Sequence, residues 1–564
     1  MSRTGTASVT QPEGSSGADQ ARPAHHTTVR CIAETAAAFA LSAIFYRLLY
    51  SQMPYHDVAR FRNQIESGHF VWDIAHIFLQ PATLLWHRYL GLGESAVDSQ
   101  RHINTFATAL AVAIFYAMLR RLRFPAWQRI FATALVAGSA SVVTLAPTGH
   151  MKLLAFPFVN AALFFGVVWE RERPQLGPKA ARMWIGCAAM LGLAASFLAS
   201  ALATGPFATL AVLVASRRAG DRWSVALRRA IAFGAIALLL FLALACFGFI
   251  AFSGLPLSAD GLRQSVTAKA DLKPPDYALT VALARLVFST ATNIAAAPAL
   301  SDIGRALISR QAHSVAPFYR VLAEQSLPVL LTLALLAAIY VRSAFALVRG
   351  AACIVPIAFL LGAQAWTIYY GVADPEHWFQ LTAPTVLLFL LLFSPWMRRW
   401  VLPVWAGTAI AANLAFVAVP VALYPLDRYQ AELQARFTPR DLVIDFMAFP
   451  GRPWGGVFQL PHVPRLELDM LAREVSDNNT YFATVKQQID AAFARGGHVY
   501  VLDVLDPNAW DAPWPELYRH HITKPALFGF FNSHYDVRYV GRMAEVKAWE
   551  LTPRPAPANG APTH

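Results

Sequence analysis

The chain has 564 residues, of which 56% are hydrophobic and only 14% are charged, and its mean hydropathy is +0.41. An average soluble domain is close to half apolar and about a quarter charged, so this composition excludes an ordinary soluble enzyme and a disordered chain. The four cysteines all lie in or beside apolar stretches, which also excludes a scaffold built on disulfides. These values predict a protein that crosses a membrane several times.

The net charge of +13 is unevenly distributed. From Tyr424 to the end there are 14 basic and 16 acidic residues, so the whole positive excess lies in the preceding part of the chain. There the basic residues gather in short loops between apolar segments, which is typical of membrane topology. We therefore expect membrane lipids, and no nucleic acid, as partners of the basic residues.

The first 29 residues are rich in Ser, Thr, Gly, Pro and His, and we expect them to form a disordered cytoplasmic tail. A helix that spans the hydrocarbon core needs about 20 apolar residues. On that measure the region 30–423 contains about eleven spans. They are Cys31–Tyr50, Ile103–Leu119, Ile130–Ala146, Leu153–Trp169, Met183–Leu202, Gly205–Ser216, Ala230–Phe252, Leu327–Val341, Ala351–Tyr369, Phe379–Trp396 and Val401–Leu423.

The loops predict the orientation, because short cytoplasmic loops carry an excess of Lys and Arg. Four arginine-containing loops fall on one side, at residues 120–123, 170–173, 217–218 and 397–399. In the short loops of the other side, Lys152 is the only Lys or Arg residue. The N-terminus is therefore expected in the cytoplasm. The loops 51–102 and 253–326 and the C-terminal region 424–564 are expected on the outer side.

The C-terminal region is predicted to be a small α/β domain. Asp441–Asp445 and His498–Asp503 are strand-like runs bounded by Pro and Gly. The segment Tyr481–Arg495 between them has helical spacing and ends at Gly496-Gly497. Strand, helix and strand indicate a βαβ-like unit, and a hairpin is expected near Tyr535–Leu551.

The first outer loop contains the strongest candidate site residues. Asp57 and its neighbour His56 follow the first span directly, and Asp57–Ile65 is predicted to form a short interfacial helix with Arg60 and Arg62 on its basic side. Asp73 and His76 follow, and then a second amphipathic stretch, Ile77–Leu90, which Pro81 interrupts.

This loop has two interpretations. A carboxylate beside cationic side chains can act as a general base while the arginines hold an anionic leaving group. Alternatively, Asp57 caps the interfacial helix and the arginines meet lipid headgroups.

Two further outer loops hold candidate residues for substrate binding. Asp374, Glu376 and His377 lie in a single loop, where they could bind a metal, orient a sugar or begin the next helix. His150 and Lys152 lie in another loop. Lys152 could neutralise a lipid phosphate or extend its ammonium to the membrane surface.

In combination these features resemble the GT-C glycosyltransferases, in particular the protein mannosyltransferase and aminoarabinose transferase superfamily. The resemblance covers most of the chain and depends on order: an acid after the first span, two amphipathic helices in a long first outer loop, and an odd number of spans before an outer C-terminal domain. Local likenesses are Ser67-Gly68 before the helix with Pro81, the Asp374–Trp378 entry to a late span, Phe437–Ile444 and Arg495–Tyr500.

The resemblance implies a bacterial inner-membrane enzyme that moves a hexose or pentose, with inversion, from a polyprenyl-phosphate donor to a lipid, glycan or protein acceptor of the envelope. Asp57 would be the general base, while Lys152 and the first-loop arginines would hold the donor phosphate. Many members carry paired acids near this position, whereas here His56 precedes a single Asp57 and Asp73 lies sixteen residues further on. No metal or other cofactor is therefore assigned, although a divalent metal is not excluded.

Two alternatives stay open. One is a lipid-linked saccharide flippase or transporter. Ionisable residues within the predicted spans are nearly confined to Glu34 and Arg47, which argues against ion-coupled transport. The other is an enzyme like the O-antigen ligases, which place their key residues in one large later loop. The sugar, the acceptor and the length of the polyprenyl chain cannot be read from the residues.

Overall fold

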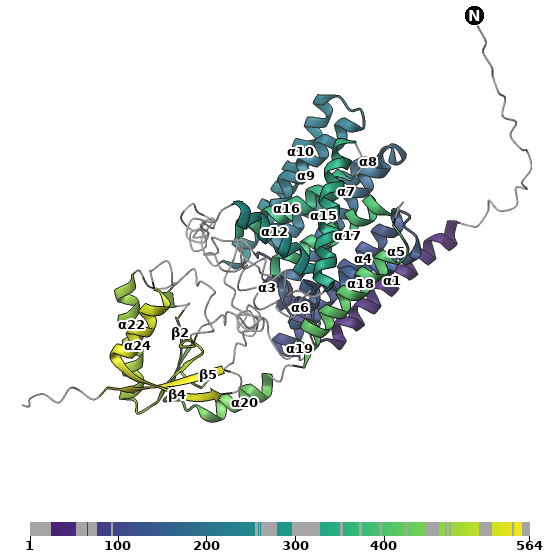
Figure 1. Ribbon diagram of the computed structural model, residues 1–564. Coiled ribbons are helices and arrows are strands. Elements are labelled where there is room, and N and C mark those ends of the chain that lie inside the picture. The colour runs from purple at the N-terminus through teal and green to yellow at the C-terminus, as the bar shows by residue number, and fades with distance from the viewer. Residues whose placement is uncertain are drawn as a thin grey trace, which may run out of the picture.

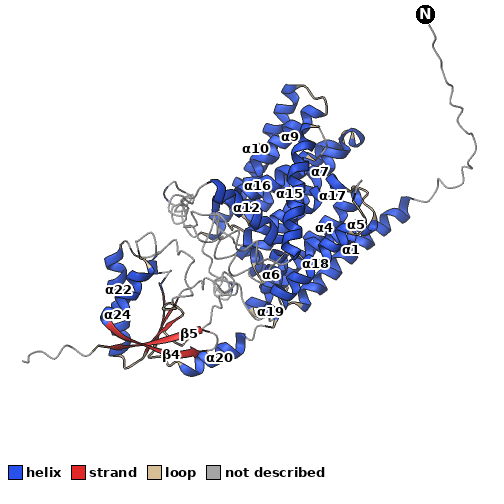
Figure 2. Ribbon diagram, viewed as in Figure 1, coloured by secondary structure: helices blue, strands red, loops and turns tan. Residues whose placement is uncertain are grey.

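The structure is a computed structural model that describes most of the membrane region and of the C-terminal domain. The described residues are 24–51, 65, 76–91, 94–253, 258, 260, 279–295, 327–349, 353–370, 375–394, 397–423, 426–445, 462–468, 471–472, 475, 477–506, 522–543 and 546–554. Figures 1 and 2 show one large bundle of helices and, apart from it, a small unit of strands and helices at the C-terminal end of the chain.

Every one of the eleven predicted spans contains a helix. Among the described residues, eight helices are long and apolar enough to cross a membrane, a bent helix pair makes a ninth candidate span, and two further apolar helices are shorter. The helices are α1 Ala24–Leu48, α4 Ala96–Arg121, the bent pair α5 Ala126–Ala137 and α6 Ala140–Thr148, α7 Phe156–Leu176, α8 Lys179–Phe197, α9 Thr204–Arg218, α10 Trp223–Phe252, α15 Leu327–Val348, α16 Ile354–Tyr370, α17 Pro375–Phe393 and α18 Val401–Asn413, which continues through the π-helix Leu414–Ala418 into α19 Val419–Ala422. The prediction of a mainly helical protein with many membrane spans is confirmed.

Several helix boundaries differ from the prediction, and one helix was not predicted. Helix α1 begins at Ala24, inside the segment expected to be a disordered tail, and α4 begins seven residues before Ile103. The loop 253–326 contains a helix, α12 (Leu279–Ile294), that packs against α15, α16 and α17. Its polar residues Thr290 and Asn293 lower its hydropathy, but in the bundle they are bonded to Gln364 and Thr382 respectively.

The bent span α5–α6 turns by 58° at Gly138 and Ser139. A break in a span exposes backbone carbonyls, which cost several kcal/mol when they have no partner in lipid. Here Tyr46 Oη donates to the carbonyl of Ala137 at 2.9 Å, and Asn413 Nδ2 donates to that of Gly138 at 2.6 Å. The bend is therefore fully compensated, and it redirects α6 toward the end of the bundle that holds the candidate site.

The C-terminal domain is a five-stranded sheet in the order β2-β1-β3-β5-β4. Its strands are β1 Leu442–Asp445, β2 Arg465–Glu467, β3 Val499–Leu502, β4 Tyr535–Met543 and β5 Val546–Pro553. β1 runs parallel to both β2 and β3, and β4 and β5 form the predicted hairpin. The predicted α/β unit is confirmed, whereas β2 and the helices α20 (Leu426–Arg436) and α24 (Lys524–His534) were not anticipated.

Helices cover both faces of this sheet. α22 (Asn478–Ala494) and α24 bury an apolar cluster on one face, and Leu433 of α20 and Phe437 just after it cover the other. Two of the stretches that resemble the family, Phe437–Ile444 and Arg495–Tyr500, lead into the adjacent strands β1 and β3. Asp441 ties them together, because its Oδ1 accepts a hydrogen bond from the amide of His498 at 2.7 Å. Gly497 permits this approach, since a Cβ there would lie 1.9 Å from the carbonyl oxygen of Arg440.

Glu550 on β5 connects three strands through its carboxylate. It accepts hydrogen bonds from His498 Nδ1 at 2.8 Å and Arg538 Nη2 at 2.5 Å. Burial acts to raise the pKa of Glu550, but the two partners outweigh it and hold that pKa below its ordinary value. The interaction thus stabilises the domain above the unfolded pKa of about 4.3, and this contribution is lost as the pH falls through the lower folded pKa.

We therefore expect the free energy of opening of β3 and β5 to fall as the pH is lowered below about 4.3. Glu550→Gln should remove this pH dependence and lower the opening free energy at neutral pH. Hydrogen exchange of the full-length protein, corrected for the intrinsic exchange rate, measures both. Asp536→Asn, at an exposed pair with Arg554, is the control. If the Glu550 variant kept the wild-type pH dependence, the stabilising role given to the Glu550 carboxylate would be wrong.

Candidate functional site

The end of α6 presents the segment that carries His150 and Lys152. Pro147 lies in the last turn of α6, and Gly149 ends the helix in the left-handed conformation, with φ +79°. The chain then enters the 3-10 helix η1 (Met151–Ala155), which leads directly into α7. His150 and Lys152 are 1% and 6% exposed, so this outer segment is folded into the bundle.

The side chain of Asn104 holds the end of α6 in place. Its Nδ2 donates to the carbonyl oxygens of Leu145 at 2.9 Å and of Ala146 at 3.2 Å. The amide of His150 also bonds to the carbonyl of Leu145, at 3.2 Å. Carbonyls at a helix end need such partners when they are buried. α4 thereby fixes where η1 begins.

The first outer loop packs against η1. Ile65 is the last residue of the predicted interfacial helix, and it is buried in one apolar cluster with Met151 and Leu154, which flank Lys152 on either side. The cluster also includes Leu79 and Leu84 of α3 (Leu79–Tyr89). Ile65 and α3 of the first outer loop therefore share a buried apolar cluster with the segment that carries Lys152.

α3 is the second predicted amphipathic helix, and His76 lies just before it. The expected interruption at Pro81 is wrong: α3 is continuous, because Pro81 stands in its first turn, where no backbone N–H is needed. Phe78 anchors the entry to α3, since its amide donates to the carbonyl of Ser196 and its ring lies 6.0 Å from that of Phe197.

The start of α17 reaches the same end of the bundle. The ring of Phe379 lies 5.3 Å from that of Phe156 at the start of α7, and Gln380 Nε2 donates to Ser200 Oγ at 2.8 Å. α17 also packs directly against η1. Because α17 begins at Pro375, Glu376 and His377 occupy its first turn, as the sequence predicted for a helix start.

The structure thus brings together three of the segments predicted to form the site: the first outer loop, η1 and the start of α17. His76, His150 and Lys152 lie in or beside them. Six predicted site residues lie outside the described residues, namely His56, Asp57, Arg60, Arg62, Asp73 and Asp374.

Sequence reasoning missed the polar residues of the first turns of α4. Arg101 Nη1 pairs with Asp98 at 3.0 Å, and Gly149 packs against the backbone and Cγ of Arg101. His102 joins α4 to the end of α1, since Arg47 donates to its Nε2 while its Nδ1 bonds to Glu94 at 2.6 Å. Ser95, whose side chain accepts from the amide of Asp98, is a helix-capping signal that marks the true start of α4.

This arrangement suits an anionic substrate. A lysine ammonium is a compact point charge that binds phosphate, and histidines nearby supply further hydrogen bonds. Within the described parts of the chain, no group of three or more His, Cys, Asp or Glu residues is placed to hold a metal ion.

Comparison with known proteins gives few matches. No protein-family model matches the chain, and no curated protein matches it. Among solved structures, ArnT from Cupriavidus metallidurans bound to undecaprenyl phosphate aligns over 94% of this chain and 98% of its own, with a TM-score of 0.47 and 13% identity. The same protein in the apo state aligns over 93% of this chain and 98% of its own, with a TM-score of 0.38 and 15% identity.

The S. cerevisiae protein O-mannosyltransferase Pmt1–Pmt2 complex bound to the sugar donor aligns over 40% of this chain and 35% of its own, with a TM-score of 0.31 and 19% identity. These TM-scores and identities are too low to assign an activity or a substrate to this chain.

Gly149 provides a test of how η1 is positioned. Gly149→Ala should lower the stability of the protein by about 1–2 kcal/mol, because its φ is left-handed, and a Cβ there would lie 3.2 Å from Arg101. Gly407→Ala in α18 is the matched control, since nothing lies within 4 Å of a Cβ at that position. Thermal unfolding of the purified protein in detergent measures both, and equal unfolding midpoints for the two variants would contradict this view of the turn.

Proposed function

We propose that the protein is an inverting GT-C glycosyltransferase that moves a hexose or pentose from a polyprenyl-phosphate donor to a lipid, glycan or protein acceptor of the cell envelope. The observation that carries the proposal is that Ile65, Met151 and Leu154 belong to one buried apolar cluster. Because Asp57 precedes Ile65 in the same outer loop, this cluster supports a site in which a general base and the phosphate-binding cation Lys152 act together. Undecaprenyl phosphate, the ligand in one ArnT structure, is a lipid of the proposed donor's class.

In the proposed reaction the Asp57 carboxylate takes the proton of an acceptor hydroxyl. The hydroxyl oxygen attacks the anomeric carbon of the sugar from the side opposite the lipid phosphate. The bond between that carbon and the phosphate oxygen breaks, and polyprenyl phosphate leaves with the bonding electrons. Lys152, together with Arg60 and Arg62, would stabilise the negative charge that develops on the phosphate.

The proposed setting is the bacterial inner membrane, with the N-terminus in the cytoplasm and the C-terminal domain in the periplasm. Residues at both ends of the bundle support this orientation: α4, α7 and α9 each carry two arginines near their C-terminal ends, while the opposite end holds His76, His150 and Lys152. Lipid-linked donors and envelope acceptors are both accessible at the periplasmic face. A flippase is the alternative, and it would need no general base.

Asp57→Asn tests the base. Loss of a general base lowers the rate by about 10² to 10⁴ fold, so turnover of a radiolabelled polyprenyl-phosphate sugar with a crude envelope-lipid acceptor should fall by that factor. The purified full-length variant should keep the wild-type unfolding midpoint. Asp536→Asn on the C-terminal domain is the control. Equal turnover in wild type and Asp57→Asn would remove Asp57 from the mechanism.

Lys152→Met tests phosphate binding. A charge-assisted hydrogen bond contributes about 1.5 to 3 kcal/mol, so the KM for the donor should rise at least about tenfold, and Lys152→Arg should recover part of the loss. Lys179→Met, at an exposed position at the start of α8 at the other end of the bundle, is the control. A donor KM that is the same in Lys152→Met and in the control would show that Lys152 does not bind the phosphate.

A further inference from the structure

A second cluster of cationic residues lies at the end of the bundle opposite the candidate site. Arg173 stands near the end of α7, Arg229 in the second turn of α10, and Ser216 near the end of α9. Each has an apolar residue four positions away, toward the middle of the bundle. Trp169 corresponds to Arg173, Phe233 to Arg229 and Val212 to Ser216. Residues four apart share a helix face, so each of the three helices presents a polar group above an apolar one.

The polar groups form one network around Asp221, in the turn between α9 and α10. Its carboxylate accepts hydrogen bonds from both Arg173 and Arg229, and its backbone carbonyl accepts one from Arg217. Burial acts to raise the pKa of Asp221, but the two arginines outweigh it and hold the pKa below its ordinary value. Two guanidinium groups thus share the carboxylate and a third binds the backbone carbonyl, which leaves the cluster positively charged.

Part of the donor capacity of this cluster is not used. Nη1 of Arg173 is buried and has no hydrogen-bond acceptor among the described residues. The nearby acid Glu170 does not supply one, since its carboxylate accepts the amides of Ile354 and Val355 at the start of α16, at 2.8 and 3.0 Å. A buried guanidinium donor without an acceptor is costly, so the cluster favours a further anion.

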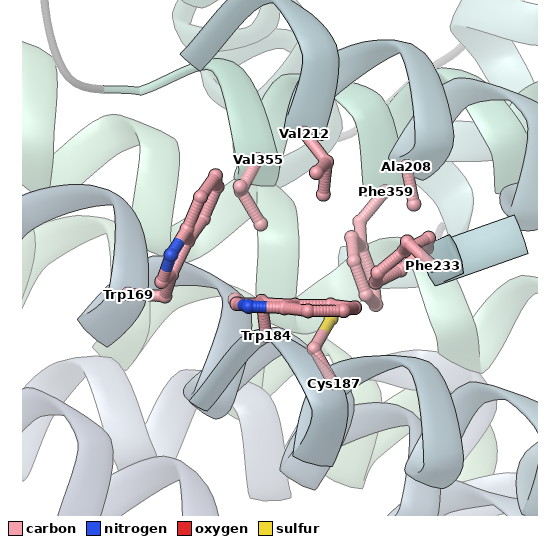
Figure 3. Close-up of a pocket in the computed structure, with 9 residues that line it drawn as sticks. Trp169, Trp184, Cys187, Ala208, Val212, Phe233, Val355 and Phe359 are labelled. Carbon is pink, nitrogen blue, oxygen red and sulfur yellow. The ribbon is translucent and has the colours of Figure 1, made fainter. Parts of the chain in front are cut away.

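A small apolar hollow lies directly beneath the cluster. Figure 3 shows the rings of Trp169, Trp184, Phe233 and Phe359 around it, with Val212 and Val355 beside them. Cys187, Ala208 and Gly166 complete the lining. The guanidinium of Arg173 lies 5.6 Å from the centre of the Trp169 ring, so the positive cluster adjoins a residue that lines the hollow.

The rim of the cluster has the character of a membrane surface. Trp223, at the start of α10, is 64% exposed, and the guanidinium of Arg217 lies 4.5 Å from the centre of its ring. Tryptophan with a basic partner is typical of the level of the lipid headgroups. A ligand at the cluster would therefore come from the bilayer.

We propose that this end of the bundle binds an anionic glycerophospholipid of the surrounding leaflet. The lipid phosphate lies against Arg173, Arg217 and Arg229, and one methylene group next to the headgroup enters the hollow beside Phe233. Free phosphate shares the anionic chemistry but leaves the hollow empty, so a phospholipid is the better match. Basic pockets between the ends of membrane helices bind anionic lipid headgroups in this way.

The test measures lipid retention by the full-length protein. Protein in detergent micelles is titrated with phosphatidylglycerol, with phosphatidylcholine or with inorganic phosphate, and the bound molecules are counted by native mass spectrometry. Wild type should retain phosphatidylglycerol in preference to the other two. Arg229→Gln should weaken that retention about tenfold, which is the loss of one charge-assisted contact. Arg228→Gln, the exposed neighbour with the same change in charge, should leave it unchanged.

A second variant tests the hollow without a change in charge. Ala208→Leu fills it, so retention of phosphatidylglycerol should fall while any binding of inorganic phosphate persists. Equal retention of phosphatidylglycerol and phosphatidylcholine by wild type would overturn the proposal. Equal losses in Arg229→Gln and Arg228→Gln would reduce it to non-specific attraction between charges. Tight binding of inorganic phosphate with no preference for phosphatidylglycerol would assign the cluster to a free anion instead.

Discussion

The buried amide of Asn104 holds the carbonyl oxygens of Leu145 and Ala146, and the position of the candidate site depends on this contact. The span α5–α6 is bent, and bent spans bring irregular backbone into the bundle, where it has to be satisfied by side chains. Tyr46 and Asn413 compensate the bend itself, and Asn104 compensates its outer end. With both ends held, Gly149 can turn the chain so that Lys152 is buried beside the first outer loop.

The two ends of the bundle use cations differently. At the candidate site the buried Lys152 follows the buried His150 and lies in the segment that packs with Ile65 of the first outer loop. We propose that this end binds the donor phosphate. At the opposite end, Arg173 and Arg229 bind the carboxylate of Asp221 and Arg217 binds its backbone carbonyl, one helical turn from an apolar hollow. We propose that this second end holds a charged lipid headgroup.

Much of the fold was predictable because membrane spans follow from hydropathy and the βαβ unit from alternating apolar residues with a glycine stop. The bend in α5–α6 was not, since Gly138 and Ser139 are ordinary residues in a span and the bend depends on distant partners such as Asn413. Helix α12 was missed for a similar reason: Thr290 and Asn293 read as polar until Gln364 and Thr382 pair with them. For the site, residue type and loop order singled out His150 and Lys152, whose role in binding stays a prediction, whereas Asn104 was hidden within an apolar segment.

We propose that the protein breaks the bond between a sugar and a lipid phosphate, and does not merely carry the lipid across the membrane. The experiment supplies purified wild-type protein in sealed proteoliposomes with a polyprenyl-phosphate sugar labelled in both the sugar and the phosphate. With an envelope-lipid acceptor the two labels should separate, with the sugar on the acceptor and the phosphate on free polyprenyl phosphate. Movement of both labels together to the other leaflet, with the donor intact, would contradict this proposal.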